Sequence, residues 1–265
     1  MMYKLPKYQR IRLPIQLIFL FASVLFTTLI VMGLNKAVHA ICPYAIVCFG
    51  ISKAGIVTAT HVSFALTIII SLGIIISSMF IGRKFCSYVC PLGTVQEAVF
   101  SLHPPSYYKR NRLSYFYESK LSRIKYLVLL ITSVLSLLGI GYLFIRICPI
   151  YALSMLPFLA IPGLVMLLFV VVSSYFADRF WCRFLCPFAA LMNVAQYVGK
   201  LFGLKRLLIR RNLERCIDCG ICMQHCPMNI NIAESEYVHS PDCIHCMKCA
   251  DKCPKPGTIC CEKDE

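Results

Sequence analysis

Negative charge is scarce in this sequence. Aspartate and glutamate number 12 against 27 lysines and arginines, and charged residues of both signs make up only 15% of the chain. Hydrophobic residues reach 58%, and the mean hydropathy of +0.71 exceeds that of a typical soluble domain. We therefore expect much of the chain to lie in a lipid bilayer. The formal net charge of +15 must then mark particular faces instead of coating the molecule.

Motifs for several cofactors and partners are also missing. The 265 residues contain no flavin, molybdopterin or haem-attachment motif, and no recognised nucleic-acid-binding motif. A complete substrate-converting site within this chain and a nucleic-acid partner are therefore not expected. The first apolar run is longer than the core of a signal peptide and lacks an A-x-A cleavage site at a plausible distance, so we expect it to be retained.

Four apolar runs each hold close to the roughly 20 residues that a helix needs to cross a bilayer. They lie near residues 13–34, 61–82, 125–147 and 151–177. Lysine and arginine gather before the first run, between the second and third, and after the fourth. By the positive-inside rule, both termini and the middle loop are predicted to be cytoplasmic, in a multi-pass protein of the cytoplasmic (inner) membrane. The basic residues are accordingly interpreted as topology signals that contact lipid headgroups.

A two-helix unit occurs twice in the sequence. Cys42-Pro43 after the first run matches Cys148-Pro149 after the third, and a CxxxCP motif follows both the second and the fourth run. Each unit contains an even number of spans, so the two copies share one orientation. A pseudo-twofold axis along the membrane normal is therefore expected to relate them.

This repeat predicts a group of four cysteines at the cytoplasmic end and a pair at the outer end. In each CxxxCP motif, the two thiols are expected one turn apart on a helix end. The four thiols can bind a further cluster or another metal, form a dithiol redox pair, or simply be small buried side chains beside a helix break. The outer pair can form a disulfide, support a quinone or metal site, or pack. The redox candidates are Cys86, Cys90, Cys182, Cys186, Cys42 and Cys148.

The C-terminal segment contains the run C-x2-C-x2-C-x3-C-P twice, at 216–227 and 243–254. Three thiolates of such a run bind one [4Fe-4S] cluster, and the fourth, before proline, binds the other cluster. Zinc sites, commonly two separated cysteine pairs, fit this spacing poorly. We predict one cluster on Cys216, Cys219, Cys222 and Cys253, and a second on Cys243, Cys246, Cys249 and Cys226.

The predicted fold class is mainly α. A four-helix transmembrane domain, a duplicated two-helix hairpin, is expected over residues 1–211. A bacterial-type dicluster ferredoxin domain, a small α+β fold stabilised chiefly by its clusters, is expected over 212–265.

Other side chains give weaker signals. His61 and His39, near the outer face, are candidates for accepting a quinol proton, or are interfacial residues. Glu97, after the first CxxxCP motif, is either a proton acceptor or solvated. Trp181 is assigned to the interfacial aromatic belt.

Four membrane spans, the duplicated CxxxCP motif and a dicluster ferredoxin together resemble the NapH family of membrane iron-sulfur proteins, the quinol dehydrogenase subunits of periplasmic nitrate reductase systems. The resemblance covers almost the whole length and is carried by the four CxxxCP cysteines and the eight ferredoxin cysteines named above. It implies oxidation of membrane quinol and electron transfer through cytoplasmic clusters towards a partner redox protein. The same core also resembles parts of the NosR and CcoG families.

The leading hypothesis is an electron-transfer subunit between the quinone pool and a partner redox protein or multisubunit oxidoreductase. The direction of flow stays open, because [4Fe-4S] potentials vary widely with their surroundings. The alternative is an assembly or regulatory factor whose membrane thiols and clusters reduce a metal ion or a disulfide of a partner enzyme. A passive anchor for a multisubunit oxidoreductase is a third reading.

Overall fold

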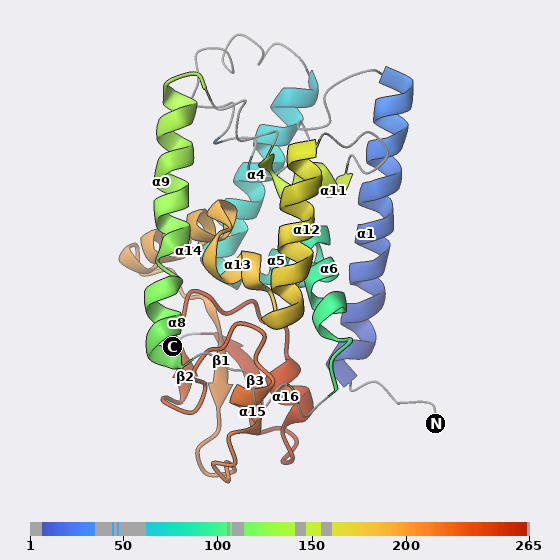
Figure 1. Ribbon diagram of the computed structural model, residues 1–265. Helices are drawn as coiled ribbons and strands as arrows, with labels where there is room; N and C mark the ends of the chain where they lie inside the picture. The colour runs from blue at the N-terminus through green and yellow to red at the C-terminus, as the bar shows by residue number, and fades with distance from the viewer. Residues whose placement is uncertain are drawn as a thin grey trace.

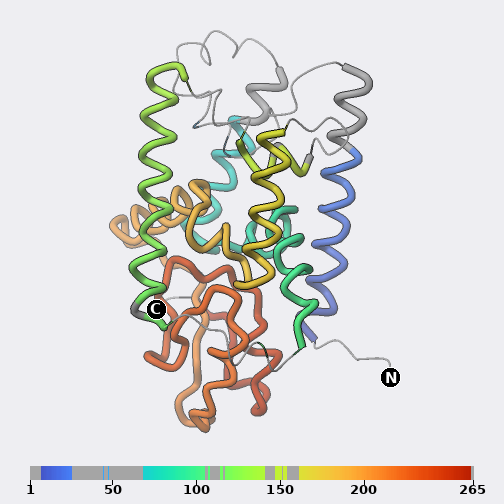
Figure 2. Tube along the Cα trace, viewed as in Figure 1, coloured from blue at the N-terminus to red at the C-terminus, as the bar shows by residue number. Residues whose placement is uncertain are grey.

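The protein is mainly helical and carries a small sheet in its C-terminal segment (Figure 1). The structure, a computed structural model, describes residues 7–34, 44, 47, 62–104, 107, 114–140, 147–154 and 161–263. The longer helices run roughly parallel in the view of Figure 2, and the C-terminal segment lies beneath one end of them. These helices are α1 (Lys7–Leu34), α4 (Val62–Ile81), α9 (Ile124–Leu137) and α12 (Ile161–Phe176). Shorter ones are α5 (Lys84–Tyr88), α6 (Pro91–Phe100), α8 (Tyr115–Leu121), α11 (Pro149–Ser154), α13 (Phe180–Phe184) and α14 (Pro187–Leu201).

The helices follow two of the four predicted runs closely and differ in the other two. Helices α1 and α4 cover the runs predicted at 13–34 and 61–82. The third prediction, a helix to residue 147, is wrong because Gly139 adopts the left-handed conformation (φ 76°). The N–H groups of Gly139 and Ile140 then bond back to the carbonyls of Ser136 and Leu135, which closes α9. In the fourth run the structure describes two helices, α11 and α12.

Within the described residues, none of the helices combines the length and the apolar character that a membrane crossing requires.

Each CxxxCP motif spans a break between two helices. Pro91 and Pro187 are the first residues of α6 and α14, where proline is tolerated because no N–H donor is needed there. Cys90 and Cys186 are the N-caps of these helices, with extended backbone at ψ 114° and 112°. The first cysteine of each motif lies in the preceding short helix, α5 or α13. The prediction that both thiols lie one turn apart on one helix end is therefore wrong.

The C-terminal segment, residues 207–263, contains a three-stranded antiparallel sheet in the order β2-β1-β3. Its strands are β1 (Leu207–Arg211), β2 (Tyr237–Val238) and β3 (Ile259–Lys263), and its short helices are α15 (Ile221–Gln224) and α16 (Lys248–Lys252). Ile209 of the central strand lies opposite both Val238 and Cys261. The central strand begins at Leu207, before the domain boundary predicted at residue 212, while α14 ends at Leu201.

One apolar core joins the C-terminal segment to the helices above it. Cys86, Phe188 and Met192 from the helices share this core with Ile209 and Met247 from the segment. Such packing holds the segment in one position against α4, α5 and α14.

The segment also caps the first helix. The carboxylate of Asp251 in α16 accepts hydrogen bonds from the backbone N–H groups of Tyr8 and Gln9, at 3.1 and 3.0 Å. These N–H groups lie in the first turn of α1, where no helical partner exists and a negative charge is favourable. The start of α1 is therefore stabilised by a residue from the far end of the chain.

The C-terminal segment approaches the helices closely at Gly82. A Cβ atom at this position would lie 2.7 Å from Cε1 of His245, and Gly82 has a φ of +63°. His245 is 4% exposed, and its Nε2 donates to the carbonyl oxygen of Leu207 at 3.0 Å. Because the ring is buried and hydrogen-bonded, it cannot easily make room for a methyl group.

Gly82→Ala should therefore destabilise the protein more than an alanine at another left-handed glycine. The matched control is Gly203→Ala, since Gly203 has a φ of +68° and open space around its Cβ position. Backbone strain should cost each variant about 1–2 kcal/mol, and the clash with His245 about 1–3 kcal/mol more for Gly82→Ala. Denaturant unfolding of the full chain measures both. Equal losses would show that the approach of His245 to Gly82 does not constrain docking.

Candidate iron-sulfur and cysteine sites

The eight cysteines of the two C-terminal runs surround two cavities. The first has an empty volume of about 400 Å³, counting its opening to solvent. Its lining includes Cys216, Cys219, Cys222 and Cys253, so it draws on both cysteine runs. Cys219 is exposed. This set is called the outer ligand set below.

The second cavity is lined by Cys226, Cys243, Cys246 and Cys249 and has an empty volume of about 380 Å³. Cys246 and Cys249 are buried. Apart from His245, the rest of the lining is apolar and includes isoleucines and a valine from the sheet and its loops, so the surroundings are more apolar than at the first cavity. This set is called the inner ligand set, and residues 243–249 are called the inner loop.

The outer cavity also presents buried polar atoms that lack a partner among the described residues. They are Nε of Arg211 and Oγ1 of Thr258. Nη1 of Arg211 already lies 3.4 Å from Sγ of Cys216. Buried donors normally have an acceptor, and the sulfurs of an iron-sulfur cluster are acceptors whose hydrogen bonds tune its potential. Four thiols and these donors fit a [4Fe-4S] cluster.

Both ligand loops turn on a residue in the left-handed conformation. Gly220 and Met247 each stand four residues after the first cysteine of their run, with φ of 67° and 57°, and each begins a short helix. This backbone is easy for glycine and strained for methionine. Met247 is nevertheless buried, and its Sδ lies 3.3 Å from Sγ of Cys261. Sequence reasoning missed Met247, whose position in the repeated run was the available signal.

The four CxxxCP cysteines lie where the two repeats meet, and Cys186 is within electrostatic range of the other three. The repeats contact each other's first thiol in equivalent ways. Sδ of Met192 lies 3.8 Å from Sγ of Cys86, and Nε2 of Gln96 donates to Sγ of Cys182 at 3.3 Å. Gln96 and Met192 each stand six residues after the second cysteine of their own motif. Among the described residues, no three His, Cys, Asp or Glu side chains are grouped to hold a single metal ion.

Two fully buried arginines each donate a hydrogen bond to the opposite repeat. Arg83 and Arg179 each stand three residues before the first cysteine of their motif. Arg83 donates to the carbonyl oxygen of Cys182 at 3.3 Å, and Arg179 donates to that of Cys86 at 2.6 Å. Gly93 leaves room for the second contact, since a Cβ there would lie 2.9 Å from Nη1 of Arg179. Nε of both arginines has no partner among the described residues, so each keeps a spare buried donor.

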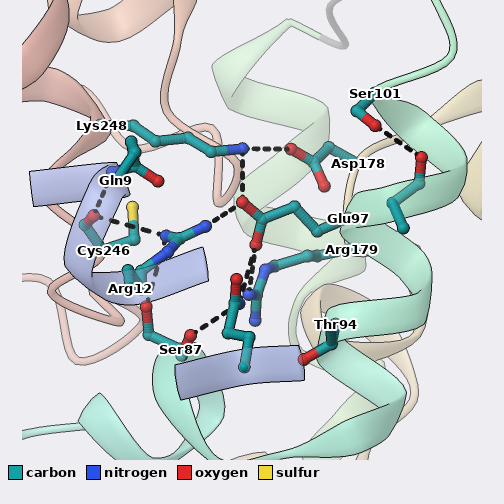
Figure 3. Close-up of polar contacts among 12 residues, drawn as sticks. Gln9, Arg12, Ser87, Thr94, Glu97, Ser101, Asp178, Arg179, Cys246 and Lys248 are labelled. Atoms are coloured by element: carbon teal, nitrogen blue, oxygen red, sulfur yellow. Dashed lines mark hydrogen bonds and ion pairs between the residues drawn. The ribbon is translucent and has the colours of Figure 1, made fainter. Parts of the chain in front are cut away.

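Glu97 of α6 pairs with cations from three other parts of the chain (Figure 3). Its carboxylate bonds Arg12 of α1, Arg179 at 2.7 Å and Lys248 of α16 at 2.8 Å. Burial alone would raise the pKa of Glu97, but the charges of Lys248, Arg179 and Arg12 outweigh it and hold this pKa well below its usual range. Glu97 is therefore ionised at neutral pH and largely buried. The interpretation of Glu97 as a solvated carboxylate is wrong, and its role as a proton acceptor stays a prediction.

Asp242, directly before Cys243, is the centre of a second network. Its carboxylate pairs with Arg83 at 2.7 Å and with Lys125, and it accepts from Nδ2 of Asn193 at 2.8 Å. Burial would raise the pKa of Asp242, but Arg83 and Lys125 lower it. The carboxylate therefore stays charged beside two cations that are fully buried. Sequence reasoning missed Asp242. The feature that could have revealed it is an acidic residue directly before a predicted cluster ligand, in a chain with few acidic residues.

The buried cations correct the interpretation of several basic residues. Arg12, Arg83, Lys125 and Arg179 are at most 1% exposed, so they pair with carboxylates and do not contact lipid headgroups. Trp181 is also buried, in a core that includes leucines of α6 and α12, and does not belong to an interfacial belt. Of the outer residues, Cys148 is buried. Cys42, His39 and His61 lie outside the described residues.

Comparison with protein families finds iron-sulfur binding domains in both halves of the chain. A family described as "4Fe-4S binding domain" matches residues 64–109 and again 159–205, and each match contains one CxxxCP motif. A family described as "4Fe-4S dicluster domain" matches residues 208–254, which contain all eight cavity-lining cysteines. The two matches of this one family correspond to the two copies of the repeat seen in the sequence.

Several curated proteins are similar to most of this chain. YccM of Escherichia coli K12 is 32% identical over 203 residues, covering 74% of this chain but only 55% of YccM. The ferredoxin-type protein NapH of Haemophilus influenzae is 30% identical over 205 residues, covering 74% of this chain and 68% of NapH. The regulatory protein NosR of Pseudomonas aeruginosa is 26% identical over 182 residues, covering 64% of this chain and 24% of NosR. No solved structure matches the chain significantly.

Glu97→Gln should destabilise the folded protein by about 3–5 kcal/mol, because it leaves buried cations without their counter-charge. Anaerobic denaturant unfolding of the full chain measures this loss. The amide keeps the shape of the side chain, so the change tests charge and not packing.

The matched control is Glu262→Gln, which removes a carboxylate from the exposed pair with Arg210. Exposed pairs contribute little, so this variant should unfold close to the parent protein. If Glu97→Gln behaves like Glu262→Gln, the buried network does not hold the structure together.

Proposed function

Because the chain belongs to the NapH family of ferredoxin-type proteins, we propose that it is a membrane-bound electron-transfer subunit between the quinone pool and a partner redox protein. Two [4Fe-4S] clusters, when bound, would supply the one-electron chemistry. The observation that carries the proposal is the pair of cavities, each lined by four cysteines, in a segment docked on the paired CxxxCP motifs.

The two ligand sets take different positions, which supports an ordered path. The inner loop contacts α1 directly, since Nε2 of Gln9 and Nη1 of Arg12 donate to the carbonyl oxygen of Cys246 at 2.9 and 3.4 Å. Cys246 shares a core with Cys86 of the first CxxxCP motif. The outer set, with its exposed Cys219, is accessible to a partner. We therefore place the inner set on the quinone side and the outer set on the partner side.

The proposal includes a third redox or metal site on the four CxxxCP cysteines. One supporting observation is the match of a 4Fe-4S binding family to both motifs. Another is the pair of buried arginines, Arg83 and Arg179, whose Nε donors lack partners among the described residues. A thiolate-bound, negatively charged group at this junction would accept hydrogen bonds from them.

The placement in the cytoplasmic membrane rests on apolar side chains that face outward from the long helices. Phe21 of α1, Ile69 of α4, Leu130 of α9 and Val165 of α12 are 68%, 65%, 62% and 61% exposed. Outward apolar side chains on all four long helices favour contact with lipid, which covers such faces in a membrane protein. The C-terminal segment and both termini are placed on the cytoplasmic side.

The direct test is iron and acid-labile sulfide per chain on anaerobically purified protein, with EPR spectra before and after addition of menaquinol. About eight irons with signals that respond to menaquinol are expected from two clusters, and about twelve from three. Eight irons whose signals ignore menaquinol, together with bound copper or reactive thiols, would instead indicate a factor that reduces a metal ion or disulfide of a partner enzyme.

Two serine variants make the iron count specific. Cys219→Ser should lower the cluster content, because it removes one of the thiols lining the outer cavity. Cys260→Ser is the matched control, since Cys260 lines neither cavity and should leave the iron content unchanged. Equal iron in both variants would contradict the outer ligand set.

Membrane attachment has its own test. After alkaline carbonate washing of membranes from expressing cells, the chain should stay in the pellet and be released only by detergent, because its outward apolar helix faces hold it in lipid. Release by carbonate alone would overturn the membrane placement and leave the cluster assignments standing.

A further inference from the structure

The two charge networks occupy equivalent places in the two repeats, but they are built from different residues. Glu97 stands seven residues after the second cysteine of its motif, and Asn193 stands seven residues after the second cysteine of the other. Glu97 pairs with Arg179, the arginine of the opposite repeat. Asn193 carries no charge and cannot pair in this way with Arg83, the equivalent arginine. The carboxylate on Arg83 is that of Asp242, at 2.7 Å.

We propose that Asp242 of the C-terminal segment replaces the carboxylate that the second CxxxCP repeat lacks, and that it positions the inner loop on the paired cysteines. Oδ1 of Asp242 lies 2.8 Å from Nδ2 of Asn193, the residue of the second repeat that is equivalent to Glu97. The charge of Asp242 therefore lies beside that equivalent position. The inference rests on the proposed function for the role of the inner loop.

Burial explains why this charge has to be supplied. Arg83 and Lys125 are fully buried, and a buried cation without a partner is strongly destabilising. Asp242 compensates both, through contacts that exist only while the C-terminal segment is docked. Folding of the second charge network and docking of the segment are thus one event.

The two networks have opposite polarity at the docking surface, which fixes the orientation of the segment. At one network the helices supply the carboxylate of Glu97 and the segment supplies the cation of Lys248. At the other, the helices supply Arg83 and Lys125, and the segment supplies Asp242. A segment docked the other way round would bring like charges together.

Both docking charges directly precede a residue of the inner ligand set. Asp242 precedes Cys243, and Lys248 precedes Cys249. Two charges on either side of the inner loop therefore hold it by both ends. Asp242 and Lys248 are positioning residues for this ligand set.

The test exchanges the two side chains that share the second network. Asp242→Asn removes the negative charge. The double variant Asn193→Asp with Asp242→Asn restores it by swapping the carboxylate and the amide between the two positions. Glu262→Gln, an exposed carboxylate of the same segment, is the control. Hydrogen exchange over residues 82–90 and 243–249, and the midpoint potentials of the EPR signals, are measured on the full chain.

Asp242→Asn should raise exchange in both stretches by at least about tenfold and shift the potential of one EPR signal, while the double variant returns both to near the parent values. Glu262→Gln should change neither. Parent-like exchange in Asp242→Asn, or no recovery in the double variant, would overturn the proposal. If Asp242→Asn fails to fold, a folded double variant supports the proposal and an unfolded one overturns it.

The outcome separates this inference from the proposed function. Recovery of hydrogen exchange in the double variant without any iron would leave the charge replacement intact and remove the electron-transfer role. Eight irons with quinol-dependent signals, without recovery of hydrogen exchange in the double variant, would overturn the charge replacement and leave the electron-transfer role intact.

Discussion

A buried cation needs a counter-charge, and in this chain that requirement joins the two halves. Glu97 and Asp242 between them compensate cations from α1, α9, α16 and the two repeats. The sequence has few other acids to take their place. Removing either carboxylate would leave several cations in surroundings where an unpaired charge costs several kcal/mol. The relative position of helices and C-terminal segment depends on these two side chains more than on any single apolar contact.

This constraint also shapes the environment of the two ligand sets. The inner loop is pressed against the helices by charge on both sides and by the core that includes Cys86 and Cys246. The outer set keeps an exposed cysteine, Cys219. Potentials of iron-sulfur clusters respond to burial and hydrogen bonding, so two sets of identical chemistry in such different surroundings should differ in potential. Such a difference would favour one of the two sets as the resting place of an electron.

Sequence patterns predicted what depends on spacing and missed what depends on burial. Hydrophobic runs located α1 and α4, because the period and length of a helix are local properties. The end of α9 was missed, since one left-handed glycine, Gly139, overrides the apolar run beyond it. The CxxxCP break was misread because Pro91 and Pro187 start helices and do not only end them. The basic residues could not be divided into exposed and buried ones, since their partners lie far away in sequence.

Two parallel chains of contacts connect the inner loop with the paired cysteines. From Cys243, the neighbouring Asp242 bonds Arg83, which bonds the carbonyl oxygen of Cys182. From Cys249, the neighbouring Lys248 pairs with Glu97, which bonds Arg179, and Arg179 bonds the carbonyl oxygen of Cys86. Each chain begins beside a residue of the inner set and ends at the first cysteine of a CxxxCP motif. Because the links are charge-assisted contacts that are buried or partly buried, they hold the inner loop at a defined position relative to the paired cysteines.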